Sequence, residues 1–128
     1  MDHIKKDCPF CYPEQSTAFI LKARMAYSVY DKYPVNPGHA LIIPVRHCSN
    51  YFDLTQKEQD ACWSMLNKVK EIIEGRYNPD GFNVGINIGH AGGQTIPHVH
   101  IHLIPRYNGD QKEPEGGVRG VIPEKQKY

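Results

Sequence analysis

Three histidines alternate with three apolar residues from His98 to Leu103. Successive side chains of a β-strand point to opposite faces, so the pattern predicts a strand with a row of imidazoles on one face. Val99, Ile101 and Leu103 would then face a core. Imidazoles about 7 Å apart along a strand disfavour one another's protonation, so we expect the row to be at least partly neutral near pH 7. A neutral imidazole can serve as a nucleophile or as a metal ligand.

Two other interpretations of this row remain open. A solvated sheet face can be rich in histidine by chance, and two histidines one residue apart on a strand are a common pair of metal ligands. A row used only for metal binding would lack the nearby Asp or Glu that most hydrolytic metal sites contain, since Asp110 lies beyond the strand. We therefore favour a row that takes part in chemistry.

The rest of the sequence predicts an α+β fold with a mostly antiparallel sheet. Strand patterns fall at 18–21, 25–30, 39–45, 82–88 and 98–105, and one helix pattern follows Thr55. Thr55 and Glu58 have the spacing of a capping box, and Gly75 predicts the end of the helix. Apolar residues recur between them at helical spacing. The helix would cover one face of the sheet and leave the other face to the histidines.

Composition and charge exclude several classes of protein. The 128 residues suit one domain, and a formal net charge of +1 argues against a dedicated nucleic-acid-binding protein. The longest apolar stretch, 40–45, is too short to cross a bilayer, and the first seven residues lack the apolar core of a signal peptide. We therefore expect no membrane association and a cytoplasmic location. A globular domain is predicted at 1–107 and an irregular tail, rich in Gly and Pro, at 108–128.

The segment from Gln94 to Ile104 resembles the signature of the histidine triad (HIT) family, in which three histidines alternate with apolar residues. The segment from Pro37 to Pro44 resembles an earlier strand of that family, and Asp53-Leu54-Thr55 resembles the start of its helix. The resemblance extends from Cys8 to about Arg106. It implies a five-stranded antiparallel sheet with one main helix, and a homodimer in which two sheets join into one of ten strands.

The resemblance also implies a nucleotide substrate. Family members attack the α-phosphate of a nucleotide conjugate with a histidine and hydrolyse the covalent nucleotidyl-histidine to the nucleoside monophosphate. By position His100 is the nucleophile, and His102 and His39 match histidines on the phosphate and leaving-group side. The positions that match nucleotide-binding residues of the family are Asp31, Asn87, Gln94 and Thr95. The backbone amide of Gly93, in a Gly-Gly pair, could also help hold the phosphates.

Cys8 and Cys11 form a C-x-x-C pair, a spacing typical of metal or redox sites in a reducing compartment. The pair alone does not distinguish zinc binding from redox chemistry or from no special role. The resemblance implies two further ligands at His47 and His98, the positions used by zinc-containing members of the family and by the related galactose-phosphate uridylyltransferases. Four such ligands would form a closed site that holds a structural Zn²⁺. A metal-free reduced site is the alternative.

These features predict a nucleotide hydrolase that cleaves adenine dinucleoside polyphosphates or related conjugates at the α-phosphate. The segment from His102 to Arg106, followed by Gly109-Asp110, resembles the branch of the family that cleaves dinucleoside polyphosphates, in its bacterial, fragile-histidine-triad-like form. A nucleoside phosphoramidase and a phosphorylase remain open as alternatives. So does a purine-nucleotide-binding interaction module without catalysis.

Overall fold

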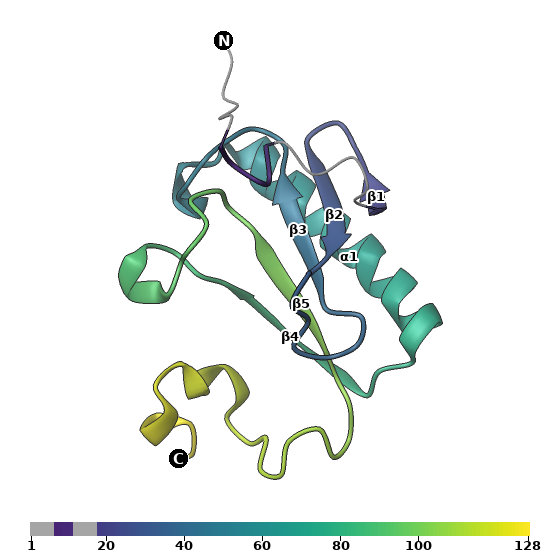
Figure 1. The fold of residues 1–128 in the computed structure, drawn as a ribbon, viewed down its shortest axis with the longest axis vertical. Helices are drawn as coiled ribbons and strands as arrows, with labels where there is room; N and C mark the ends of the chain where they lie inside the picture. Colours follow the sequence, from purple (N-terminus) through teal and green to yellow (C-terminus); the bar gives the residue numbers. More distant parts are fainter. Residues whose placement is uncertain (1–6, 12–17) are drawn as a thin grey trace.

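Five antiparallel strands form one sheet in the spatial order β1-β2-β3-β5-β4 (Figure 1). The computed structural model describes residues 7–11 and 18–128. The strands are β1 (Phe19–Lys22), β2 (Ala26–Tyr30), β3 (Ala40–Pro44), β4 (Gly81–Ile86) and β5 (Ile101–Arg106). With the single long helix, they confirm the predicted α+β fold. The histidine-bearing strand β5 is internal, paired with β3 on one side and with β4 on the other.

The helix α1 (Gln56–Tyr77) begins with the predicted capping box. The Thr55 hydroxyl accepts from the Glu58 amide at 3.1 Å, and a Glu58 carboxylate oxygen accepts from the Thr55 amide at 2.8 Å. The predicted stop at Gly75 is wrong. Space around Gly75 is open, and the helix continues through it to Tyr77. The next residue, Asn78, adopts the left-handed conformation at φ 53°. Asparagine tolerates that conformation better than other residues with a Cβ, so it serves as the cap.

The sheet buries apolar side chains on both faces. Against α1 lies the main core, which contains Ala26, Ala40, Ile42, Cys62, Met65, Leu66, Val69, Ile73, Ile101 and Leu103. On the opposite face a second cluster forms from Tyr27, Val29, Leu41 and Ile43, with Phe10 packed against it. Strand β3 is apolar at every position because it contributes to both layers.

Strand β5 begins at Ile101, three residues later than the sequence predicts. The ladder with β3 ends at the Ile42–Ile101 pair, because Pro44 has no amide hydrogen to donate further along. The Val99 amide instead donates to the carbonyl of Cys48 at 2.8 Å. Burial still alternates as predicted on the core side, with Val99, Ile101 and Leu103 all at most 1% exposed.

Short 3-10 helices lie outside the sheet. They are η1 (Tyr51–Asp53), η2 (His90–Gly92), η3 (Gly117–Val121) and η4 (Pro123–Lys125). Within the last segment, shown in yellow in Figure 1, Nε2 of the Gln126 side chain donates to the carbonyls of Glu113 and Glu115, and η3 lies beside β4. The domain boundary predicted at residue 107 stays a prediction. Among the described residues, no helix has both the length and the apolar character needed to cross a bilayer.

Candidate functional site

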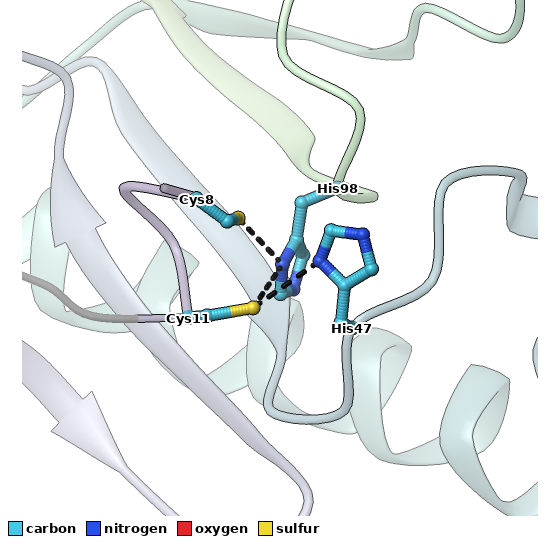
Figure 2. Close-up of side chains that lie close together, drawn as sticks. All are labelled: Cys8, Cys11, His47 and His98. Atoms are coloured by element: carbon cyan, nitrogen blue, oxygen red, sulfur yellow. Dashed lines mark hydrogen bonds between the residues drawn. The ribbon is translucent and has the colours of Figure 1, made fainter. Parts of the chain in front are cut away.

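Cys8, Cys11, His47 and His98 gather at one point although they come from three separate segments (Figure 2). Their ligand atoms all lie within 4.8 Å of one another. Sγ of Cys8 is 3.3 Å from Nδ1 of His98, and Sγ of Cys11 is 3.2 Å from Nδ1 of His47. Two thiols and two imidazoles with converging donor atoms fit the closed tetrahedral coordination that Zn²⁺ prefers. All four predicted ligands are thus brought together.

The ring of His98 is held in one orientation. Its Nε2–H donates to the carbonyl of Pro44 at 2.8 Å, so in the neutral ring the Nδ1 lone pair points toward the two cysteines. The side chain is fully buried, and burial lowers its pKa below the usual value. A metal ligand with its second nitrogen bonded to a backbone carbonyl is a common arrangement in zinc sites.

The ring of His100 is oriented by the backbone of His98. Nδ1 of His100 lies 2.9 Å from the carbonyl oxygen of His98, and a carbonyl only accepts, so the hydrogen is on Nδ1. In the neutral ring Nε2 then carries the free lone pair. The ring centroids of His100 and His102 are 5.1 Å apart, closer than the spacing along an extended strand. Because His98 and His100 are buried, a solvated sheet face does not describe this row.

A chain of hydrogen bonds sets the tautomers of His39 and His102. The amide of Val35 donates to Nδ1 of His39 at 3.0 Å, so Nε2 of His39 carries the hydrogen. That Nε2 lies 3.0 Å from Nδ1 of His102 and 3.5 Å from a carboxylate oxygen of Asp31. His102 therefore accepts at Nδ1 and carries its own hydrogen at Nε2.

Both of these rings favour the neutral state. Burial lowers the pKa of His39, against the opposing attraction of Asp31. Burial also lowers the pKa of His102 to about 4, with further contributions from His100 and His39. This agrees with the expectation that the row is at least partly neutral near pH 7.

A cavity of about 790 Å³ opens beside His100 and His102. Its volume is in the range of small-molecule sites. Besides these two histidines, four residues predicted to serve the site line it: Asp31, His39, Asn87 and Thr95. Much of the remaining wall is apolar or aromatic, from Phe10, Val29, Tyr30, Leu41 and Ile96. The cavity thus combines an apolar wall with a cluster of imidazoles.

Gln94 and Gly93 do not line this cavity. The Gln94 side chain instead accepts from the amide of Gly89 at 2.9 Å and donates to the carbonyls of Ser49 and Ile96. Gly93 has φ +89°, and a Cβ there would lie 4.0 Å from Nδ2 of Asn87. Their predicted contacts with nucleotide stay predictions.

The apolar wall is what sequence reasoning missed. Val29 and Leu41 are direct partners across β2 and β3 and face away from the helix. A signal for them was present, because the uninterrupted apolar run at 40–44 implies a second covered face. Nothing in the sequence indicated that Phe10, between two cysteines, would complete that face.

The family model of the HIT domain matches residues 12–109. AP-4-A phosphorylase of Mycobacterium tuberculosis (strain CDC 1551 / Oshkosh) is 38% identical over 92 residues, which cover 71% of this chain and 47% of that protein. Bis(5'-nucleosyl)-tetraphosphatase (asymmetrical) of Schizosaccharomyces pombe is 35% identical over 102 residues, or 80% of this chain and 56% of that protein. This chain therefore spans about half the length of these curated relatives.

Solved structures agree with the sequence relatives. A HIT family protein from Bacillus anthracis superposes with a TM-score of 0.77 at 32% identity, covering 82% of this chain and 77% of that chain. A Zn-bound histidine triad family protein from Mycobacterium smegmatis superposes with a TM-score of 0.74 at 28% identity, covering 84% and 80%. The fold, the aligned sequence and the triad itself place this chain in the HIT domain family.

Proposed function

We propose that this protein is a nucleotide hydrolase that cleaves adenine dinucleoside polyphosphates, or related conjugates, at the α-phosphate. The observation that carries the proposal is the tautomer of His100, whose Nδ1–H is bonded to the His98 carbonyl while the ring lines the cavity. A lone pair held at Nε2 is what a nucleophilic histidine needs. Relatives named AP-4-A phosphorylase, bis(5'-nucleosyl)-tetraphosphatase and bis(5'-adenosyl)-triphosphatase support the substrate class.

Two displacements complete the proposed reaction. Nε2 of His100 attacks the α-phosphorus, a nitrogen–phosphorus bond forms, and the bond to the bridging oxygen of the leaving group breaks. That oxygen departs with the electron pair and accepts a proton. Water then attacks the same phosphorus and gives up a proton, the bond to His100 breaks with its electron pair returning to Nε2, and the nucleoside monophosphate is released. Splitting one difficult hydrolysis into two steps is the advantage of covalent catalysis.

The neighbouring imidazoles support both steps. His102 carries its hydrogen at Nε2, as the bond from His39 requires, and so can donate to a phosphoryl or leaving-group oxygen. His39 orients His102 and completes the proposed catalytic set. Asp31, which lines the cavity beside them, is proposed to bind the ribose hydroxyls, while Asn87 and Thr95 contact the phosphates.

We propose that Zn²⁺ occupies the Cys8, Cys11, His47 and His98 group in a structural role. The ion would join the N-terminal loop to the loop after β3 and to the start of the triad, and a closed set of four ligands leaves no position for substrate. We also propose a homodimer, as the resemblance to the family implies, and a cytoplasmic location. One zinc per chain by elemental analysis would support the metal assignment.

His100→Ala tests the nucleophile, with His90→Ala as the matched control because His90 is exposed on η2, outside the cavity lining. We expect His100→Ala to lower kcat for diadenosine tetraphosphate at least about 10³-fold and to leave AMP binding largely intact. Substrate labelled at the α-phosphate, quenched without acid, should leave label on His100 of the wild type. Label on His98 or His102, or normal turnover by His100→Ala, would overturn the mechanism.

A panel of substrates separates the alternatives. Hydrolysis releases AMP and needs only water, whereas the phosphorylase alternative, favoured by the name of one relative, requires inorganic phosphate for turnover. Adenosine phosphoramidate tests the phosphoramidase. Binding of AMP without turnover of any of these compounds would identify an interaction module instead of an enzyme.

A further inference from the structure

Phe10 belongs to both sites. It lies between the thiol ligands Cys8 and Cys11 in the sequence, and its side chain lines the proposed nucleotide cavity. Its ring meets the ring of His98 edge-on with centroids 5.9 Å apart, and the ring of His100 with centroids 5.1 Å apart. The loop that supplies half of the metal ligands is therefore also a wall of the cavity.

Tyr27 joins this loop to the sheet. Its hydroxyl donates to the carbonyl of Phe10 at 2.6 Å, and its ring lines the same cavity from β2. Burial, reinforced by Cys8 and Cys11, raises the pKa of Tyr27, so the hydroxyl keeps its hydrogen. This bond to the sheet and the side chains of the two flanking cysteines both help to hold Phe10 in place.

His98 forms a second connection between the two sites. Its ring contacts both cysteines through Nδ1, and its backbone carbonyl accepts from Nδ1 of His100. Any displacement of the His98 backbone would therefore change the bond that orients the proposed nucleophile. Metal ligation and orientation of His100 depend on one residue.

We propose that metal binding and nucleotide binding are positively coupled through Phe10. A metal bound by Cys8 and Cys11 holds Phe10 in the cavity wall, where it packs against bound nucleotide. A nucleotide in the cavity holds the same loop in its metal-binding conformation. Because such coupling is reciprocal, each ligand raises the affinity for the other by the same factor. The proposal rests on the proposed function, since it requires a nucleotide in this cavity.

Two binding measurements test the coupling without using turnover. Zn²⁺ affinity is measured by competition with a chromogenic chelator, with and without saturating AMP. AMP affinity is measured by equilibrium dialysis on zinc-loaded and on chelator-treated protein. We expect AMP to tighten Zn²⁺ binding about three- to tenfold, the ratio that one aromatic contact supplies, and Zn²⁺ to tighten AMP binding by the same factor.

Phe10→Ala isolates the route. This variant keeps all four metal ligands, so it should still bind Zn²⁺ and AMP, but the coupling factor should fall toward one. Phe52→Ala is the matched control, because Phe52 is 72% exposed on η1 and should leave the factor unchanged.

Each other outcome overturns the proposal. Zn²⁺ affinity that is the same with and without AMP means that the sites are independent. Full coupling in Phe10→Ala means that another route connects the two sites. Unfolding of the whole chain on metal removal would be one such route, and circular dichroism of the chelator-treated protein would show it. If AMP binds neither the zinc-loaded nor the chelator-treated protein, the proposed function is overturned as well. Failure of the coupling alone is distinguished from this by AMP binding that does not depend on zinc.

Discussion

Substitution of Gln94 tests whether this side chain binds nucleotide, as the family resemblance implies, or braces a loop. Its Oε1 accepts from the amide of Gly89 at 2.9 Å, and its Nε2 donates to the carbonyls of Ser49 at 2.7 Å and Ile96 at 3.1 Å. These bonds close the loop at 89–96 and join it to the chain after β3. They use both amide hydrogens and the carbonyl oxygen of the side chain.

Three bonds at a net 0.5–1.5 kcal/mol each would amount to about 1.5–4.5 kcal/mol. Water can replace part of this at a partly exposed position, so we expect Gln94→Ala to destabilise the fold by about 1–2 kcal/mol. Gln94→Glu keeps the acceptor for Gly89 but places an oxygen against the carbonyls of Ser49 and Ile96. We expect that variant to lose about 2–3 kcal/mol, because two donors disappear and a carboxylate oxygen faces the partial negative charge of two carbonyl oxygens.

Urea denaturation measures the stability of both variants, and initial rates on diadenosine tetraphosphate give KM. If Gln94 braces the loop, Gln94→Glu is the less stable variant. The KM of either variant, measured at a temperature well below its melting temperature, then changes by less than about threefold. Gln56→Ala, at an exposed glutamine at the start of α1, is the control and should stay within about 0.5 kcal/mol of wild type. Unchanged stability with a tenfold higher KM would refute the bracing role and indicate a phosphate contact.

Three further predictions concern stability, protonation and assembly. Arg46 donates to both carboxylate oxygens of the buried Glu58 side chain. Arg46→Ala removes both bonds and should lower the free energy of unfolding, measured by urea denaturation, by about 2–3 kcal/mol. Arg46 also holds the pKa of Glu58 near 2, so its stabilisation is complete above pH 4.5 and the difference from wild type should shrink as pH falls from 4.5 to 2. Nitrogen NMR should show His102 titrating near pH 4, with its hydrogen on Nε2 above that pH. Because the unfolded chain takes up this proton near pH 6.5, the fold should lose stability as pH falls from 6.5 to 4. Titration of His102 near 6.5 would contradict its burial and its hydrogen bond with His39. Light scattering should give a mass near twice 14.6 kDa, and a single-chain mass at micromolar concentration would contradict the dimer.

The parts of the fold that the sequence predicted are those with local causes. The capping box at Thr55 and Glu58 depends on contacts three residues apart, and the strands depend on period-two burial. The two errors have non-local causes. Gly75 continues the helix because nothing crowds it, and β5 begins late because the adjacent strand β3 ends in Pro44, which has no amide hydrogen to extend the ladder. Neither condition can be read from the nearby sequence.

The candidate site divides in the same way. The C-x-x-C pair and the alternating histidines are local patterns, and the resemblance supplied His47 as their partner. The apolar wall is assembled from Phe10, Val29 and Leu41, which lie far apart in the sequence. Strand pairing and a loop that returns over the sheet bring them together, so only the three-dimensional structure shows that the cavity has a second, apolar side.

The three histidines of the row have identical side chains and even spacing, and the different roles we propose for them rest on the partner of each ring's other nitrogen. Nε2 of His98 is bonded to the Pro44 carbonyl, which leaves Nδ1 for the proposed metal. Nδ1 of His100 is bonded to the His98 carbonyl, which leaves Nε2 for the proposed attack on phosphorus. Nδ1 of His102 accepts from His39, which leaves an Nε2–H for donation. Two of these partners are backbone carbonyls and the third is a ring held by the Val35 amide, so the tautomers are set before substrate arrives. Such preorganisation lowers the cost of stabilising charge in the transition state, because no group has to reorient during the reaction.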